Sequence, residues 1–316
     1  MSDAADAVQA NVPENADALL RRLEWTVLRR LDGLLQGDHR TLWRGGGLDL
    51  ADLREYQHAD DVRHIDWNVT ARLQVPHVRQ FTEDRELTAW FVLDLSGSVD
   101  FGSGERTKLS VSEGFVAALA RLLTRQGNRV GALLYRPGAP RVVLPPAVGR
   151  LQVLRLLALM RQPPPAPSRG ETRLAELLGH AEGLLRRRAM VFVVSDFISA
   201  PGWDAPLGRL ARRHEVLAVR LYDALEMALP DVGLVTLEDA ESGEQLFVDT
   251  ADEGFRARFA VLADAQETAL RDALTRAGVD ALELTTDDAL LPSLLRFIGL
   301  RRQRLRLPAS RRLAAA

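Results

Sequence analysis

The stretch at residues 91–100, FVLDLSGSVD, ends an apolar run with three oxygen-bearing side chains at alternate positions, Asp94, Ser96 and Ser98. Three chemistries use such a turn: a phosphate cradle, a covalent aspartate, or a hard metal ion with an open coordination position. Short polar residues of this kind also favour a helix cap and a tight turn by themselves. The rest of the sequence must separate these alternatives.

Two other segments offer oxygen ligands. Asp196 follows the apolar run VFVVS, and Thr172 lies in RGETRLAELL, where a helix is expected to begin. Ligands of open α/β sheets bind beyond the carboxyl ends of the strands, where loops from different strands converge. We therefore expect five side chains at one edge of a sheet: Asp94, Ser96, Ser98, Thr172 and Asp196. Two carboxylates and three hydroxyls suit Mg²⁺ or Mn²⁺, with Ca²⁺ as a third option, and leave a position for water or for a carboxylate of another molecule.

The other chemistries lack their sequence patterns. No G-x-x-x-x-G-K-[ST] phosphate loop occurs, and GSGERTK at 102–108, which resembles one superficially, is interpreted as a flexible loop. An enzyme that phosphorylates Asp94 would resemble the haloacid dehalogenase phosphatases, whose pattern has a second aspartate where Ser96 stands. No G-x-S-x-G occurs, and the six histidines show no placement typical of a triad. A metal site is the chemistry that these residues favour.

Composition limits the classes of function. The formal net charge of -2 gives no global electrostatic case for nucleic-acid binding. The absence of cysteine excludes disulfides and thiolate metal or redox sites. The acidic start lacks the regions of a secretory signal, and no apolar run reaches the roughly 18 residues that span a membrane. We expect a cytoplasmic protein with no membrane span and no nucleic-acid partner.

Alternating strand and helix patterns predict an α/β domain over 88–299. Apolar, β-rich runs occur at 88–95, 129–135, 189–194 and 216–221, and helical patterns at 109–126, 172–188 and 203–213. Such alternation is typical of a mainly parallel sheet covered by helices on both faces. The remaining expected elements are an antiparallel edge strand at 141–144, a helix at 150–160, a proline-rich loop at 162–170, a hairpin around Ser242 and Gly243, a helix at 255–277, a strand at 281–286 and a closing helix at 290–299.

Three segments flank this domain. Residues 1–37 hold a tail and an amphipathic helix expected at 13–36, and residues 300–316 form a basic tail expected to be flexible. Residues 38–87, with a strand expected at 75–81, are predicted to pack on the domain. Their charged side chains are interpreted as an ion-pair network rather than a second metal site: Asp60, Asp61, Arg63, Asp66 and Arg72.

The candidate residues resemble a known pattern. Asp-x-Ser-x-Ser after a strand, a threonine in Gly-x-Thr-x-Leu and an aspartate after a later strand are similar to the metal-ion-dependent adhesion site of von Willebrand factor A domains. The upstream LREYQHADDVRHIDWNVTAR resembles, more narrowly, the bacterial family named domain of unknown function 58. The resemblance covers roughly residues 37–299. Val99, Glu171 and Phe197 depart from the usual methionine, glycine and glycine, and an inward-turned Glu171 would fill the open metal position itself.

This resemblance implies a von Willebrand A-like, Rossmann-like fold and a metal-dependent protein-binding adaptor rather than an enzyme. The cation held by the five candidate residues would accept an acidic side chain of a partner. Members of the family are often paired with AAA+ ATPases of the MoxR type, so the expected partners are such an ATPase, its client protein, or both, in assembly or maturation of the client. The alternative from another class is a metal-dependent phosphohydrolase that uses the same cation as a Lewis acid.

Overall fold

The computed structural model describes residues 49–57, 65–82, 87–163, 170–290, 292–294 and 296. They fall into two compact units, one within 38–87 and the other from Thr88 onward. The helix expected at 13–36, the tail at 300–316 and part of the closing helix expected at 290–299 lie outside the described residues. The packing of residues 38–87 on the domain stays a prediction.

The smaller unit contains a hairpin and a short helix. Strand β1 (Asp49–Glu55) pairs antiparallel with β2 (His77–Thr82), and α5 (Trp67–Leu73) lies between them in the sequence. The side chain of Asp66 caps α5 by accepting hydrogen bonds from two backbone N–H groups of its first turn. The strand expected here is confirmed. Three members of the expected ion-pair network lie outside the described residues: Asp60, Asp61 and Arg63.

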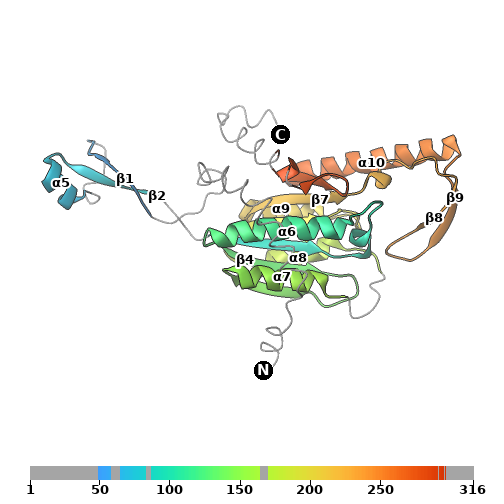
Figure 1. Ribbon diagram of the computed structural model, residues 1–316, viewed down its shortest axis with the longest axis horizontal. Helices are drawn as coiled ribbons and strands as arrows, with labels where there is room; N and C mark the ends of the chain where they lie inside the picture. The colour runs from blue at the N-terminus through green and yellow to red at the C-terminus, as the bar shows by residue number, and fades with distance from the viewer. Residues whose placement is uncertain are drawn as a thin grey trace, which may run out of the picture. The chain divides into compact units, whose positions relative to one another are not determined.

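The larger unit is built on a six-stranded sheet in the order β10-β7-β6-β3-β4-β5 (Figure 1). Its strands are β3 (Thr88–Asp94), β4 (Arg129–Tyr135), β5 (Val142–Ala147), β6 (Met190–Ser195), β7 (Glu215–Tyr222) and β10 (Asp280–Thr285). All neighbouring pairs are parallel except β4 and β5, which are antiparallel and place β5 at an edge. The mainly parallel α/β sheet and its antiparallel edge strand, both predicted from the sequence, are confirmed.

Helices cover both faces of this sheet: α6 (Lys108–Arg125), α7 (Arg150–Arg161), α8 (Leu174–Leu184), α9 (Asp204–Arg213) and α10 (Glu253–Ala277). Helices α6 and α7 pack together on one face, and α8, α9 and α10 pack on the other (Figure 1). The helices fall where the periodicity predicts them. The exception is α8, which begins after Thr172, so that Thr172 itself lies in the preceding loop.

Alternate residues of the central strands build one core on each face of the sheet. Trp90 of β3 belongs to the cluster that includes residues of α8 and α9. Its neighbour Phe91 stacks instead on Phe192 of β6, with ring centroids 5.1 Å apart, and Phe115 of α6 meets Phe192 edge-on at 6.2 Å. Because both faces are buried, these strands are continuous apolar runs in the sequence, and polar residues begin only where the strands end.

A separate hairpin, formed by β8 (Leu234–Glu238) and β9 (Gln245–Asp249), precedes α10. It is a two-stranded sheet of its own and does not join the six-stranded sheet. Its base is closed by a hydrogen bond of 2.8 Å from the N–H of Thr250 to the carbonyl oxygen of Gly233. The hairpin expected around Ser242 and Gly243 is thereby confirmed. In Figure 1 it extends beside the six-stranded sheet from the end at which α10 begins.

Candidate functional site

Asp94 is the last residue of β3, and it is 1% exposed. Its Oδ1 accepts a hydrogen bond of 3.0 Å from the backbone N–H of Ser96, and its Oδ2 accepts one of 2.7 Å from the hydroxyl of Ser195, at the end of neighbouring β6. Burial and, next, the negative charge of Asp196 raise the pKa of Asp94 to about 7, although the hydrogen bonds oppose this rise. The carboxylate therefore lies in a place that is short of positive charge.

Ser96 and Ser98 lie in the turn after β3, where the 3-10 helix η4 (Gly97–Asp100) begins. Both residues are buried, and their hydroxyl oxygens are 3.1 Å apart. Each hydroxyl oxygen has lone pairs that can accept hydrogen bonds or bind a cation. The structure thus brings the three residues of the Asp-x-Ser-x-Ser pattern together in one buried loop.

Asp196 follows β6 and is buried like Asp94, but its partners differ. Its Oδ1 accepts a hydrogen bond of 3.0 Å from the N–H of Ile198, and its Oδ2 pairs with the Nζ of Lys108 at 2.8 Å. Lys108 is the first residue of α6, is buried, and also pairs with Glu226. Burial alone would lower the pKa of Lys108, but the charges of Asp196 and Glu226 outweigh it, and the pKa is raised.

Lys108 was not among the predicted site residues, because the glycine-rich sequence before it favours a loop that extends to 108. Its position at the start of an apolar helical pattern was the available signal. Ser195, the hydroxyl partner of Asp94, was missed because a serine at the end of an apolar run has no distinguishing spacing. Ser195 thus contacts Asp94, and Lys108 contacts Asp196.

Thr172 is fully buried in the loop before α8. Its carbonyl oxygen accepts hydrogen bonds from the hydroxyl of Ser199 at 2.8 Å and from the N–H of Ala200 at 3.0 Å, so this loop is tied to the loop after β6. Its hydroxyl donates to Oε1 of Glu241, and its N–H donates to Oε2 of Glu241 at 2.8 Å. Glu241 lies at the tip of the β8–β9 hairpin, and nothing in the sequence pointed to it.

Glu171, beside Thr172, does not fill the open position. Its side chain is 62% exposed and lies 4.0 Å from the Nε of Arg173. The inward-turned arrangement considered from the sequence is therefore absent from the structure. The carboxylate that reaches Thr172 belongs to Glu241 instead.

Phe197 explains one departure from the adhesion-site pattern. Its φ of +61° lies in the left-handed region, which glycine adopts at little cost and phenylalanine rarely adopts. The ring is buried and lies 5.1 Å from the ring of Trp203. Aromatic packing therefore holds a backbone conformation that disfavours this residue type, and it fixes the loop that carries Asp196.

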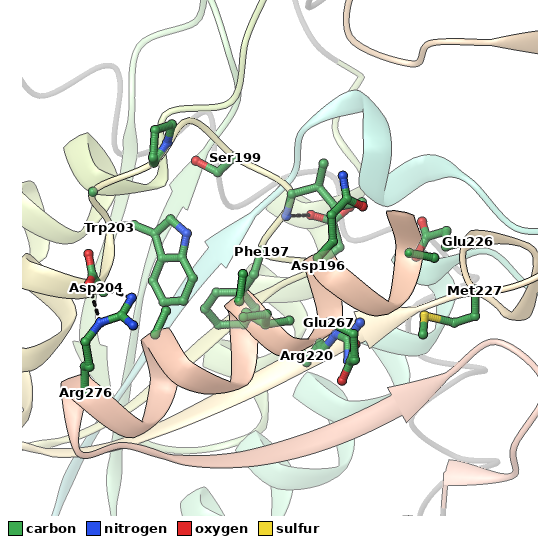
Figure 2. Close-up of a pocket in the computed structure, with 18 residues that line it drawn as sticks. Asp196, Phe197, Ser199, Trp203, Asp204, Arg220, Glu226, Met227, Glu267 and Arg276 are labelled. Carbon is green, nitrogen blue, oxygen red and sulfur yellow. Dashed lines mark hydrogen bonds and ion pairs between the residues drawn. The ribbon is translucent and has the colours of Figure 1, made fainter. Parts of the chain in front are cut away.

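A pocket of about 380 Å³ adjoins this loop (Figure 2). Phe197 and Trp203 line its centre, and an ion pair between Arg220 and Glu267, 2.5 Å apart, lies beside them. Of the five predicted site residues, Asp196 is the one that lines this pocket. The pocket therefore borders the Asp196 side of the predicted site, away from the hydroxyls that would serve as ligands.

The donors at this edge fit a hard cation. Across the described parts of the chain, no group of three or more histidine, aspartate or glutamate side chains could hold a metal, so a cation here would need the hydroxyl oxygens as well. Each carboxylate oxygen of Asp94 accepts one hydrogen bond and keeps a further lone pair. Burial first, and next the charge of Asp196, raise the pKa of Asp94, which has no cation beside it in the described structure, whereas Lys108 offsets the charge of Asp196. An oxygen-only donor set of this kind suits Mg²⁺ or Mn²⁺.

A family model described as protein of unknown function DUF58 matches residues 52–269. The chain belongs to the DUF58 family. Two curated relatives, uncharacterized proteins of Mycobacterium bovis and Mycobacterium tuberculosis, are each 41% identical to it over 292 residues, which is 90% of this chain and 90% of theirs. The DUF58 family, which residues 53–72 together with the adhesion-site pattern predicted, is thereby confirmed.

Solved structures give likenesses of fold. BatB from Bacteroides thetaiotaomicron is 13% identical with a TM-score of 0.43, over 69% of this chain and 99% of that one. The von Willebrand A domain of SpRpn10 is 11% identical with a TM-score of 0.38, over 67% of this chain and 95% of that one. The mainly parallel sheet with helices on both faces, predicted as part of a von Willebrand A-like fold, is present in this DUF58 protein, and von Willebrand A domains are among the matched structures.

The predicted cytoplasmic location is contradicted. An aerotolerance-related membrane protein from Bacteroides fragilis is among the matched structures, 13% identical with a TM-score of 0.42, over 69% of this chain and 99% of that one. The lack of a signal pattern or a long apolar run in this sequence does not by itself fix the compartment of the chain. Among the residues described, no helix is long and apolar enough to cross a bilayer.

Proposed function

We propose that this chain is a metal-dependent protein-binding adaptor that takes up an acidic side chain of its partner. The proposed cation ligands are Asp94, Ser96, Ser98, Thr172 and Asp196. One observation carries the proposal: a carboxylate, that of Glu241, is already held by the buried hydroxyl and N–H of Thr172 at this edge of the sheet. Because the loop at Thr172 already holds the carboxylate of Glu241, it supports the proposal that an acidic side chain of a partner binds at the same place.

Each part of the site has a role in this proposal. A bound Mg²⁺ or Mn²⁺ supplies an electrophilic position at which an acidic side chain replaces water. Ser195 and the N–H of Ser96 orient the Asp94 carboxylate. Lys108 offsets the charge of Asp196 and so reduces the repulsion between the two aspartates. Ser199 and Ala200 hold the Thr172 loop in place.

We assign the site no catalytic role. General base catalysis needs a carboxylate or histidine that is free to accept a proton from the attacking group. Both oxygens of Asp196 are engaged, one by Lys108 and one by the N–H of Ile198. Both oxygens of Asp94 accept hydrogen bonds, and in this proposal their remaining lone pairs bind the cation. This arrangement favours binding over the phosphohydrolase alternative.

The proposed partners are a MoxR-type AAA+ ATPase, its client protein, or both, with the chain acting in assembly or maturation of the client. The test is the affinity of the purified chain for the MoxR-type ATPase of the same organism, measured in Mg²⁺, in Ca²⁺ and in EDTA. We expect binding in Mg²⁺ that weakens about tenfold or more in EDTA and in Thr172→Ala, a loss of about 1.4 kcal/mol or more. Circular dichroism should report an intact fold for the variant.

The matched control is Glu171→Ala, which changes an exposed carboxylate beside Thr172. It should bind the ATPase as the wild type does. Equal affinity of the wild type in Mg²⁺ and in EDTA, with Thr172→Ala binding equally well, would overturn the proposed function for this partner.

A further inference from the structure

The tip of the β8–β9 hairpin lies on the proposed cation site. Glu241 reaches Thr172 with both carboxylate oxygens, and its backbone carbonyl oxygen accepts a hydrogen bond of 3.1 Å from the N–H of Gly170. Glu241 is partly buried, whereas its neighbours Ala240 and Ser242 are exposed. The side chain of Glu241 is therefore the part of the tip that enters the protein.

The tip also touches the other loop of the site. A Cβ added to Gly97, which stands between Ser96 and Ser98, would lie 2.5 Å from the carbonyl oxygen of Ala240. That distance is too short for two non-bonded heavy atoms, so the approach of the hairpin requires glycine here. The tip thus bridges the Asp-x-Ser-x-Ser loop and the Thr172 loop, which together supply four of the five proposed ligands.

Hydrogen bonds within the tip itself hold its conformation. Asp239 accepts hydrogen bonds from the N–H of Glu241 at 2.9 Å and from the hydroxyl of Ser242 at 2.8 Å, and its carbonyl oxygen accepts one of 2.7 Å from Gly243. Gly243 has a φ of +73°, which suits glycine in a tight turn. The turn presents Glu241 in a fixed direction, so little conformational entropy is lost when its carboxylate docks.

We propose that Glu241 is a built-in ligand of this site, occupying the position that a partner's acidic side chain must take. This inference rests on the proposed function and adds its regulation. A tethered carboxylate acts at an effective concentration in the millimolar range, so an isolated acidic side chain cannot displace it at micromolar concentration. A partner that binds must offer further contacts besides its carboxylate.

The tip of the hairpin can leave the site while its base stays in place. The hairpin shares no strand pairing with the six-stranded sheet, and Leu234, Leu246 and Phe247 are 82%, 62% and 78% exposed, whereas Val248 of β9 is buried. Release of the tip therefore breaks the hydrogen bonds to Gly170 and Thr172 and the contact at Gly97, while the ladder between β8 and β9 remains.

The experiment uses the full chain, Mn²⁺ as the metal and acetate as a free carboxylate, with the variant Glu241→Ala and the control Glu244→Ala. Glu244 is exposed on the same tip, and its backbone carbonyl, which accepts from Asp239, is kept in the control. Water-proton relaxation reports the number of exchanging waters on bound Mn²⁺. Amide hydrogen exchange of residues 170–173 and 239–244 reports whether the tip is docked.

In Glu241→Ala, water should replace the lost carboxylate, so the relaxivity of bound Mn²⁺ should rise above that of the wild type, and acetate should lower it again. The wild type and Glu244→Ala should show low relaxivity and no acetate effect at the same concentrations. Exchange at Thr172 should become about tenfold faster in Glu241→Ala alone, because its N–H loses a charged acceptor.

The outcomes separate this inference from the proposed function. Suppose that Mn²⁺ binds the wild type and Glu241→Ala with equal relaxivity and no response to acetate. The proposal that Glu241 is a ligand is then wrong, whereas the proposal that the chain binds a cation is still supported. If Mn²⁺ binds neither protein, the cation site fails and the inference fails with it. If exchange at Thr172 is unchanged in Glu241→Ala, the tip does not dock through this side chain, which also overturns the inference.

Discussion

Asp94 and Asp196 end neighbouring parallel strands, and both are almost fully buried, but they lie in different electrostatic surroundings. Asp196 has a buried cation within 2.8 Å, the ammonium of Lys108. The partners of Asp94 are a hydroxyl and a backbone N–H, and burial, with the Asp196 charge, raises its pKa to about 7. The charge of Asp196 is thus offset within the fold, whereas the charge of Asp94 is not offset by a positively charged side chain in the described structure.

This difference gives the two sides of the proposed site different roles: Asp196, although also a proposed ligand, belongs to a structural half that Lys108 holds, and Asp94 belongs to a binding half. An isolated buried charge is costly, and it is retained where a partner offsets the cost. Lys108 offsets it for Asp196 and ties β6 to α6 in doing so. For Asp94 we propose that a divalent cation offsets it. Removing Lys108 should therefore lower the stability of the fold even without metal, whereas removing the charge of Asp94 should lower stability only when metal is present.

The largest expected effect is that of Lys108→Met. This change leaves Asp196 buried without its cation, and removing one partner of a buried ion pair costs about 3 to 5 kcal/mol. We expect a loss of this size in the free energy of unfolding, measured by urea titration in EDTA. The double variant Lys108→Met with Asp196→Asn should recover most of the loss. A loss below about 1 kcal/mol for the single variant would show that Asp196 does not depend on Lys108 for its stability in the fold.

A smaller effect is expected at Thr172, which tests whether the third loop belongs to the binding half. Thr172→Val removes one hydrogen bond to Glu241 and one proposed ligand while it keeps the buried shape. We expect about 1 kcal/mol lower stability and about tenfold weaker Mn²⁺ binding, both measured by calorimetry. Thr172→Ser keeps the hydroxyl and should stay near the wild type. Indistinguishable Mn²⁺ affinities for the valine and serine variants would remove Thr172 from the ligand set.

The smallest effect concerns His214, which ends α9 at the opposite edge of the sheet. Burial and the charges of Arg213 and Arg188 lower its pKa, so folding disfavours its protonation. Below the ordinary pKa of 6.5, His214 gains a proton in the unfolded chain but binds it less readily in the folded chain. Stability is therefore lost as pH falls from about 6.5 toward the lowered value. His214→Gln should flatten this part of a stability–pH curve, with or without Mg²⁺; an unchanged slope would mean that other groups cause it.

The sheet and the ends of its strands could be predicted from the sequence for a physical reason. Strands buried on both faces are continuous apolar runs, so their ends are marked by the first polar residues, Asp94 and Ser195 followed by Asp196. Parallel order then brings these ends together. The turn residues Ser242 and Gly243 likewise marked the hairpin.

The missed residues depend on contacts between distant parts of the chain. Glu241 is one of several acidic residues in a polar turn, and it differs from its neighbours only because the hairpin folds back onto Thr172. Lys108 follows a glycine-rich segment and is buried only because Asp196 and Glu226 come to it in the fold. Local periodicity contains neither fact. The compartment was also predicted wrongly, because the absence of a signal pattern and of a long apolar run does not by itself fix where a chain is located.

The most direct test of the binding half is calorimetric titration of Mn²⁺ into the wild type and into Asp94→Asn, with circular dichroism to establish that the variant is folded. We expect one Mn²⁺ bound to the wild type, a gain in stability of about 2.7 kcal/mol at an Mn²⁺ concentration of one hundred times Kd, and neither effect in Asp94→Asn. In EDTA the asparagine variant should be at least as stable as the wild type, because it lacks a buried charge. No Mn²⁺ binding to the wild type, or equal binding to a folded Asp94→Asn, would show that Asp94 does not hold a cation.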